Sequence, residues 1–339
     1  MIKINGSPDT SKWKEFIYNH PFGNIFQTLE MAKVYKSTKN YEPISLAAID
    51  EKYDEILGIL LGVVISEKNG LLKTLSSRLI VQGGPLFQDT PAGQNAATLL
   101  INHYDEIVRK KGLYNEIRML SDIPQFDSII TNCDYIFENH YNAFIHLKNR
   151  SVEELWKQIK RDKKRGIKKA EESGITIEEC NDINEIEIVY KLISETYKVA
   201  QIPLADISLF KSVFDILVPG NMALILFAKY KGKYIATQVA LMDKKTVYAW
   251  YTGSSRQFLS YHPGDLLIWH LLKWGIENKY SIFDFGGGGS ETKNTNLREY
   301  KQRFGTEFPD YGRYNKVYSP YKMNISKIGF NIYKRICIK

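Results

Sequence analysis

Cysteine is scarce in this 339-residue sequence, which contains only Cys133, Cys180 and Cys337. Three widely spaced cysteines without a Cys-x-x-Cys pair predict neither a disulfide framework nor a zinc site. The six histidines also lack a His-Glu-x-x-His or other ligand spacing, so we expect no metal. No motif indicates another cofactor, and we expect none.

Several familiar sequence signals are missing as well. There is no Gly-x-Ser-x-Gly, no Gly-x-x-x-x-Gly-Lys-Ser/Thr and no Gly-x-Gly-x-x-Gly between a strand and a helix, which argues against serine hydrolases, P-loop enzymes and Rossmann oxidoreductases. No run approaches the ~20 apolar residues that span a bilayer, and the N-terminus is polar. We therefore expect a soluble cytoplasmic protein without a signal peptide or a transmembrane helix.

Positive charge, in contrast, is abundant. Lys and Arg number 46 against 38 Asp and Glu, which gives a net charge of +8. This charge favours an anionic partner, and nucleic acid, nucleotide phosphates and an acidic membrane face all fit. The length and the 44% of hydrophobic residues suffice for about two domains with a core each.

The chain repeats one order of predicted elements. In the first half, apolar strand-like runs at 56–66 and 71–81 lead to a helix at 96–111 and a strand at 114–120. In the second half, three strands at 223–230, 234–242 and 246–252 precede a helix at 265–278 and a strand at 281–285. Helical patterns precede both copies, at 13–20 and 29–39 and at 183–200 and 207–217. The pattern predicts two similar α/β units of the order β-β-β-α-β.

A basic segment lies between the two copies. Ser151, with Glu154 three positions on, is typical of a helix N-terminus, and we expect one helix from there toward Gly174. A contact with an anion and a solvated basic face explain its charge density equally well. Its cations, against one internal acid at Asp162, are Lys157, Lys160, Arg161, Lys163, Lys164, Arg165, Lys168 and Lys169.

The C-terminal stretch 325–339 alternates apolar residues with lysine and arginine. This pattern predicts an amphipathic helix, and we favour packing on the protein over contact with lipid.

An acid and a glycine run mark the most specific stretch of the chain. An apolar strand ends near Asp284, and four glycines stand at 286–289. A short segment later, Lys301 lies between Tyr300 and Phe304. Glycines admit a ligand or another backbone, and a lysine framed by aromatic rings can direct its charge at developing negative charge. We interpret this layout as a reaction centre; the ordinary alternative is a glycine-rich turn beside a surface lysine.

The order and spacing of several motifs resemble the FemABX family of peptidoglycan interpeptide-bridge aminoacyltransferases, which are built from two acetyltransferase-like (GNAT) units. The resemblance covers nearly the whole chain. It implies a duplicated GNAT fold of mixed sheets flanked by helices, with residues 1–147 and 318–339 in a first domain and 148–317 in a second. The motifs are 24–33, Gly83-Gly-Pro85, 164–174, 248–254, Phe283-Asp-Phe-Gly-Gly287, and Tyr300-Lys301 before Phe304-Gly305.

The activity that the resemblance implies is transfer of an amino acid from aminoacyl-tRNA to an amine of a peptidoglycan precursor. The family lysine falls on Lys301, which would stabilise the carbonyl oxygen or the departing tRNA end. Tyr251 matches a tyrosine that faces the substrate, and Asp284 an acid that organises the site. A nucleotide-contacting lysine fits either Lys33 or Lys36. The remaining expected residues are Tyr300, Phe304, Gly286 and Gly287 for substrate and Lys160, Lys164, Arg165 and Lys168 for tRNA.

One stretch departs from the family pattern. Members that hold a uridine-diphosphate sugar use an arginine and, four positions on, a tyrosine, where this chain has Ala205 and Leu209. Either Lys211 or the basic segment takes over phosphate binding, or the acceptor carries no nucleotide. We expect an aminoacyl-tRNA donor, a nucleotide- or lipid-linked precursor as acceptor, and a monomer in the cytoplasm; a peripheral contact with the inner membrane face stays open.

Two other functions stay open. An acyl-CoA-dependent GNAT N-acyltransferase, acting on a cell-surface amino sugar or small amine, needs an Arg/Gln-x-x-Gly-x-Gly/Ala cradle before the helix. The stretch 260–264 (Ser-Tyr-His-Pro-Gly) lacks this cradle, and we expect its His262 to be a cap or loop residue rather than a base. A non-catalytic nucleic-acid-binding protein would stack bases on aromatics between its cations, but Trp156 is the only aromatic residue of the basic segment.

Overall fold

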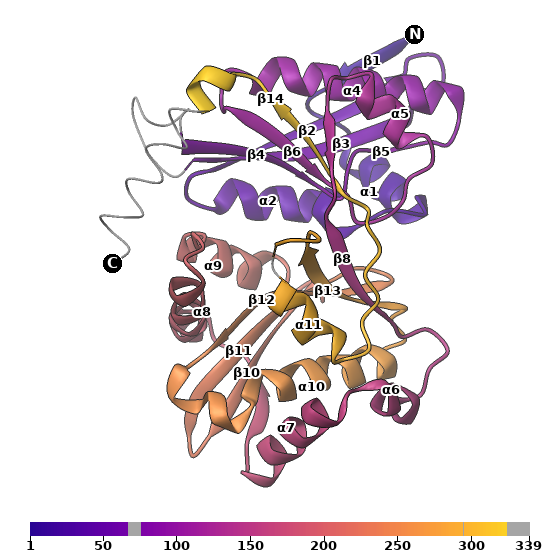
Figure 1. The fold of residues 1–339 in the computed structure, drawn as a ribbon. Coiled ribbons are helices and arrows are strands. Elements are labelled where there is room, and N and C mark those ends of the chain that lie inside the picture. Colours follow the sequence, from indigo (N-terminus) through magenta and orange to yellow (C-terminus); the bar gives the residue numbers. More distant parts are fainter. Residues whose placement is uncertain (67–75, 294, 324–339) are drawn as a thin grey trace. The chain divides into compact units, whose positions relative to one another are not determined.

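The computed structural model describes residues 1–66, 76–293 and 295–323. The chain divides into unit 1, Met1–Asn139 with Tyr311–Lys339, and unit 2, His140–Asp310. Each unit contains one mixed sheet with its own helices (Figure 1). The predicted tail helix at 325–339 and Cys337 lie outside the described residues.

Unit 1 is built on a sheet of the order β1-β2-β3-β4-β6-β14-β7, with β5 paired to β3. Neighbouring strands are antiparallel except β4 and β6, which are parallel. The strands are β1 Ile2–Asn5, β2 Tyr41–Asp50, β3 Glu55–Ser66, β4 Ser77–Gln82, β5 Leu86–Phe87, β6 Tyr114–Arg118, β7 Ile136–Glu138 and β14 Arg313–Val317. The helices are α1 Thr10–Asn19, η1 Ile25–Gln27, α2 Leu29–Ser37, α4 Pro91–Val108 and α5 Phe126–Thr131.

Local signals explain where these helices begin. Asp9, Thr28 and Thr90 each accept a backbone N–H in the first turn of α1, α2 and α4, and Pro91 opens α4. Helix α4 then packs against β3, where a Cβ at Gly62 would lie 2.4 Å from the hydroxyl oxygen of the buried Tyr104. Only glycine leaves room for that ring.

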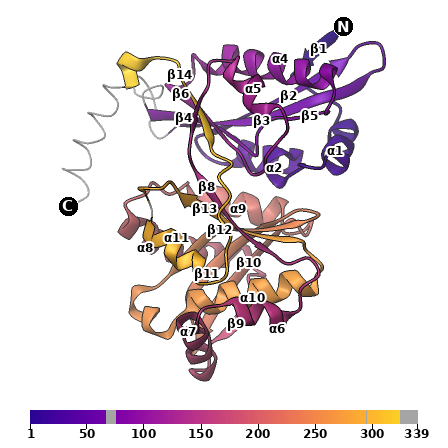
Figure 2. The same cartoon turned by 45° about the vertical axis from the view of Figure 1, so that its right-hand side comes forward.

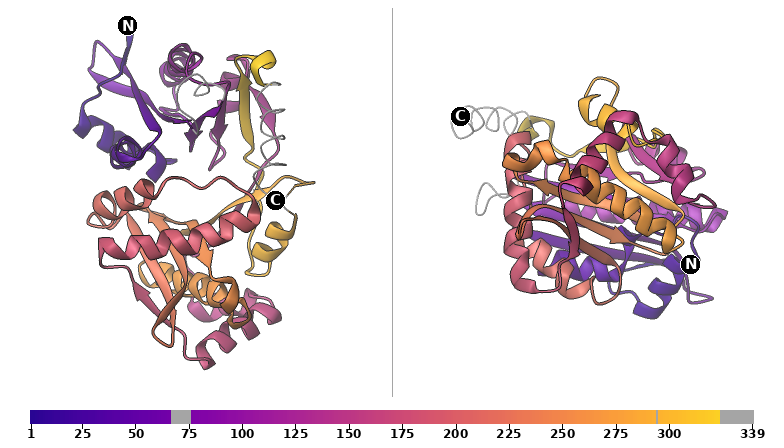
Figure 3. Two further views of the ribbon diagram at one scale, coloured as in Figure 1. Left: turned by 90° about the vertical axis from the view of Figure 1, so that its left-hand side faces the viewer. Right: turned by 90° about the horizontal axis from the view of Figure 1, so that it is seen from below.

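Unit 2 has a sheet of the order β8-β13-β12-β11-β10-β9, in which β12 and β13 are the parallel pair. Helix α10 covers one face, and α8 and α9 cover the other (Figures 1 and 3). The strands are β8 Tyr141–His146, β9 Thr176–Glu179, β10 Ala223–Tyr230, β11 Lys233–Met242, β12 Thr246–Ser254 and β13 Ile282–Gly289. The helices are α6 Val152–Gln158, α7 Arg161–Glu172, η3 Ile183–Glu185, α8 Ile186–Ala200, α9 Ile207–Ile216, η4 Arg256–Tyr261, α10 Pro263–Glu277 and α11 Thr295–Gln302.

The predicted repeat order is present: β2, β3, β4, α4 and β6 follow the same order as β10, β11, β12, α10 and β13, with the short β5 between β4 and α4. The runs predicted at 56–66 and 71–81 correspond to β3 and β4, residues 71–75 lie outside the described part of the chain, and β2 was not predicted. The last strand is longer than predicted, because its glycines continue to pair with β8.

The single helix predicted from Ser151 toward Gly174 is wrong. The capping box of Ser151 and Glu154 is present, but α6 ends at Gln158 and α7 begins at Arg161. Between them, Ile159, which is buried, and Lys160, which is exposed, have extended backbone angles. The N–H of Lys160 donates to the carbonyl of Arg303 at 2.8 Å, which replaces a bond within a continuous helix.

Both expected domain boundaries lie further along the chain than the division between the units. Strand β8 pairs with β13 and therefore belongs to unit 2, whereas β14 pairs with β6 and β7 and belongs to unit 1. Within the described residues, no helix combines the length and the apolar character that a membrane crossing requires.

Candidate functional site

The reaction-centre stretch lies in unit 2, where the parallel strands β12 and β13 part. Their pairing runs from Thr246 opposite Ile282 to Tyr248 opposite Asp284. Beyond this point β13 pairs only with β8, and the register shifts at its glycines. Figure 2 shows α11, which carries Lys301, in the same unit; this helix packs against β13.

The ammonium group of Lys301 is buried against the glycine-rich end of β13. Lys301 is 6% exposed, and its Nζ donates to the carbonyls of Phe285 and, at 2.9 Å, Gly287. An ammonium has three N–H donors, and among the described residues no acceptor takes the third. Lys301 is therefore not the surface lysine of the ordinary alternative.

Burial changes the charge equilibria of this site. It lowers the pKa of Lys301 to about 8, against an upward effect of the Asp284 carboxylate. Burial also raises the pKa of Asp284 to about 6, opposed by the N–H of Gly286 and by Lys301. That N–H donates to Oδ1 of Asp284 at 2.6 Å. Near pH 7 the site accordingly holds a carboxylate and an ammonium that deprotonates more easily than an ordinary lysine.

Two of the four glycines are explained by the backbone and by neighbouring side chains of the protein. Gly286 has a φ of +78°, which favours glycine, and a Cβ there would lie 3.7 Å from Lys301 Nζ. A Cβ on Gly287 would lie 2.7 Å from Nε2 of His140. Gly286 is therefore favoured by its backbone angle, whereas close approach requires glycine at Gly287, where the neighbour is a side chain of unit 2.

The expected aromatic frame of Lys301 is wrong in one respect. Tyr300 and Phe304 face a second buried lysine, Lys163 of α7, whose Nζ lies 4.0 Å and 5.6 Å from the two ring centroids. The ring beneath Lys301 is that of Phe285, at 5.4 Å. Neighbouring residues on a helix point in different directions, and so Tyr300 and Lys301 contact different partners.

Tyr251 lies on β12, three residues beyond the last pair with β13. Its half-buried ring packs with those of Tyr197 and Phe210, with centroid distances of 5.6 Å and 5.0 Å. A role of Tyr251 toward the substrate remains a prediction.

The four lysines and arginines expected to bind tRNA lie on or next to α7. Lys160, Arg165 and Lys168 are exposed, whereas Lys164 is half-buried and donates to the carbonyl of Lys157 at 3.1 Å. The exposed cations of α7 lie away from the buried face formed by Gly166, Ile167 and Ala170.

The predicted nucleotide-binding lysines differ in their surroundings. Lys33 and Lys36 are exposed on α2 of unit 1. Lys211 on α9 forms an ion pair with Glu187 at 2.9 Å, which offsets its charge. His262 precedes α10 and caps it without a side-chain bond to the helix backbone.

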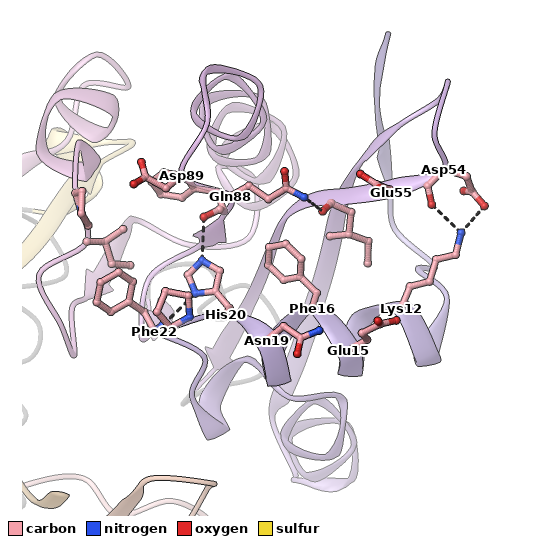
Figure 4. Close-up of a pocket in the computed structure, with 15 residues that line it drawn as sticks. Lys12, Glu15, Phe16, Asn19, His20, Phe22, Asp54, Glu55, Gln88 and Asp89 are labelled. Atoms are coloured by element: carbon pink, nitrogen blue, oxygen red, sulfur yellow. Dashed lines mark hydrogen bonds and ion pairs between the residues drawn. The ribbon is translucent and has the colours of Figure 1, made fainter. Parts of the chain in front are cut away.

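One pocket, of about 830 Å³, belongs to unit 1 and contains none of the predicted site residues (Figure 4). It is lined by aromatic and aliphatic side chains and by four carboxylates, against one cation, Lys12, which pairs with Asp54. This lining disfavours phosphate. Sequence reasoning missed the pocket because its residues come from separate segments; the carboxylates are Glu15, Asp54, Glu55 and Asp89.

Comparisons with known proteins agree with this geometry. Residues 157–302 match the acetyltransferase (GNAT) domain family. A UDP-N-acetylmuramoylpentapeptide-lysine N(6)-alanyltransferase of Weissella viridescens is 22% identical over 94% of this chain and 97% of its own length.

Solved structures show the same fold at low identity. The crystal structure of FemX has a TM-score of 0.71 at 14% identity and covers 98% of this chain and 99% of that one. A tandem GNAT protein from the clavulanic acid biosynthesis pathway has a TM-score of 0.62 at 10% identity, with 94% and 99% covered. The chain is thus an acyltransferase with an acetyltransferase (GNAT) domain over residues 157–302. Over nearly its whole length it has the fold of FemX and of a tandem GNAT protein, which fits the resemblance of its motifs to the FemABX family.

Proposed function

We propose that the protein is an aminoacyltransferase that moves an amino acid from aminoacyl-tRNA to an amine of a peptidoglycan precursor. The observation that carries the proposal is the buried Lys301 ammonium beside the glycine-rich end of β13, one N–H of which has no acceptor among the residues that the structure describes. The full-length similarity to a lysine N(6)-alanyltransferase supports this choice of reaction.

In the proposed reaction, the acceptor amine attacks the ester carbonyl that links the amino acid to tRNA. A carbon–nitrogen bond forms, the carbonyl oxygen becomes an oxyanion, and the free N–H of Lys301 stabilises it. The ester carbon–oxygen bond then breaks, and the amine proton passes to the ribose oxygen that leaves. The products are an amide and uncharged tRNA.

The other residues have supporting roles in this proposal. Asp284 accepts the N–H of Gly286 and so orders the strand end whose carbonyls hold Lys301; it is an organiser and not the base. The exposed cations Lys160, Arg165 and Lys168 fit the phosphates of tRNA. Tyr251 and either Lys33 or Lys36 are proposed to contact the acceptor.

The acceptor is a peptidoglycan precursor that presents a primary amine. The Weissella relative is named for a UDP-linked pentapeptide and its lysine. In this chain the arginine and tyrosine of UDP-sugar binders are replaced by Ala205 and Leu209, and Lys211 is paired with Glu187. We therefore include lipid-linked as well as UDP-linked muropeptides among the acceptors to be tested, and we propose a cytoplasmic monomer.

The direct test incubates the protein with mixed charged tRNAs and candidate muropeptides, and reads the product by mass. A mass increase of one amino acid residue on the muropeptide, dependent on charged tRNA, is the expected result. No increase with any charged tRNA, together with acylation of an amine from acyl-CoA, would replace the proposal.

That second candidate, an acyl-CoA-dependent N-acyltransferase, is supported by the acetyltransferase domain match over 157–302. The start of α10 speaks against it. Pro263 lacks an N–H donor, and Asp265 places a buried carboxylate in the first turn. Both features weaken the helix N-terminus as a site for the pyrophosphate of coenzyme A.

A further inference from the structure

A second buried lysine lies in unit 2 and has no role in the transfer derived above. Lys163 on α7 is 9% exposed, and its Nζ donates to both carboxylate oxygens of Asp265, at 2.9 Å and 3.0 Å. Asp265, in the first turn of α10, is 5% exposed. The hydroxyl of Tyr300 on α11 donates to Oδ1 of the same carboxylate at 2.9 Å. The carboxylate of Asp265 thus joins three helices, through an ion pair with α7 and a hydrogen bond from α11.

The approach of these helices is close. A Cβ on Gly166 would lie 3.0 Å from the ring of His262 and 3.1 Å from Oδ2 of Asp265. Nδ1 of His262 lies 3.4 Å from that oxygen. The glycine of the basic motif therefore has a packing reason, since it lets α7 bring Lys163 to Asp265.

The cluster reaches the reaction centre through α11. Tyr300 precedes Lys301, and the rings of Tyr300 and Phe304 pack on Phe285 with centroid distances of 6.4 Å and 5.5 Å. Phe285 is the residue whose carbonyl accepts from Lys301. The same helix segment is therefore held at Asp265 on one side and at β13 on the other.

We propose that Lys163, Asp265 and Tyr300 are positioning residues, which set α11 against β13 and so hold the Lys301 ammonium in place for transfer. The proposal rests on the proposed role of Lys301. A buried ion pair is a weak source of stability compared with apolar side chains of the same volume, but its hydrogen bonds have defined directions. A geometric role explains such a pair better than a role in stability.

The test compares Tyr300→Phe with a matched control, Tyr280→Phe. The first variant removes only the hydroxyl bond to Asp265 and keeps the ring. The second removes a hydroxyl from a ring that stacks on Trp274 in the same unit. We expect Tyr300→Phe to lower the single-turnover rate by about 10- to 100-fold, because small displacements of reacting groups cost this much. The KM value should match that of the wild type, and the melting temperature should fall only slightly, because Lys163 still donates to both oxygens of Asp265. The control should transfer normally.

A second pair of variants addresses Lys163 itself. Lys163→Met leaves the Asp265 carboxylate buried and unpaired, so both the melting temperature and the rate should fall. Lys163→Arg keeps the charge and the two hydrogen bonds and should recover most of the rate.

A readout without turnover separates this proposal from the proposed function. The pKa of Lys301 is measured by NMR on protein with 15N-labelled lysine. Burial is the larger cause of the lowered pKa of Lys301, against the upward effect of Asp284. An ammonium displaced toward solvent in Tyr300→Phe is therefore less desolvated, and its pKa shifts upward. We expect the pKa to rise from about 8 toward the ordinary ~10.4.

An unchanged Lys301 pKa and rate in Tyr300→Phe, equal to those of Tyr280→Phe, would overturn the positioning role. If the wild type uses acyl-CoA and not charged tRNA, the donor assignment fails, and the same variants are compared with acyl-CoA. If Tyr300→Phe then raises the pKa of Lys301 and slows acylation from acyl-CoA, the positioning role is still supported.

Discussion

Each unit contains one parallel strand pair, and the two pairs end differently. In unit 1, β4 pairs with β6 up to Gln82 opposite Arg118, the last residue of β6. In unit 2, pairing of β12 with β13 stops at Tyr248 opposite Asp284, although both strands continue. The parallel pair thus stays hydrogen-bonded to the end of β6 in unit 1, which we call the closed end. In unit 2 the two strands separate before they end, which we call the open end.

Charge is also arranged differently at the two ends. In unit 1, Glu116 on β6 accepts from Arg118 and, at 3.1 Å, from Arg313 of β14. Burial alone would raise the pKa of Glu116, but the two guanidinium groups lower it below its ordinary value. In unit 2, Lys301 donates to two neutral carbonyls, and no acceptor in the described part of the chain takes its third N–H. In unit 1 the cations thus face a carboxylate, whereas in unit 2 the cation faces neutral acceptors.

The largest expected effect comes from Lys301→Met, which removes that donor. Single-turnover transfer from charged tRNA should slow by about 10²–10³-fold, the usual cost of one oxyanion-stabilising donor. Thermal melting should show an intact fold. Lys211→Met is a control for the loss of a lysine elsewhere in unit 2, although an acceptor contact of Lys211 would appear in KM. Transfer at the wild-type rate would return Lys301 to a structural role.

The pH dependence of the transfer rate should show the ionisations of both Lys301 and Asp284. Lys301 must be protonated to stabilise an oxyanion, so the rate should fall about tenfold per pH unit above its pKa of about 8. If ionised Asp284 is needed as organiser, the rate falls below its pKa of about 6.

Asp284→Asn tests the coupling between these two groups. The carboxylate raises the pKa of Lys301, and so its removal should move the alkaline limb of the rate profile to lower pH. The acid limb should disappear. An alkaline limb at the wild-type position would show that Lys301 is not the group that titrates there.

The basic surface of unit 2 should have a smaller effect, on binding rather than chemistry. Replacement of Lys160, Lys164, Arg165 and Lys168 by glutamine should weaken tRNA binding and flatten its salt dependence, by about one unit of slope per lost phosphate contact. A control with the same change in charge replaces Lys14, Lys39, Lys52 and Lys110 of unit 1. Equal tRNA affinity in both variants would support the solvated-face alternative.

The smallest effect on transfer is expected at the closed end of unit 1. Glu116→Gln weakens the bonds to two arginines and should lower the free energy of unfolding by about 1–3 kcal/mol, measured in urea. Transfer per folded molecule should not change. A rate loss without a stability loss would mean that this end also takes part in the reaction.

Local pattern predicted much of this molecule. The repeated β-β-β-α-β order, the capping box at Ser151 and the glycine run beside Asp284 depend on neighbours along the chain, and each is present. The break in the basic segment at Ile159 was missed, because a bond to the carbonyl of Arg303 decides it. Such a partner leaves no trace in the local sequence.

Lys163 was counted among the cations of the basic segment without being set apart as buried, although a signal was available. Lys163, Gly166, Ile167 and Ala170 recur at helical spacing and form the buried face of α7. A cation on such a face requires a buried partner. The identity of that partner could not be read from the pattern.

By itself, the sequence determined the two α/β units and the nature of the reaction-centre residues, because strand period, caps and glycines act over a few positions. Only the tertiary structure decided which lysine lies under which ring. Lys163 and Asp265 are 102 positions apart, and the free N–H of Lys301 depends on how α11 meets β13. An ammonium owes its pKa and its free donors to whatever the fold packs around it, and that environment comes from segments distant in the chain.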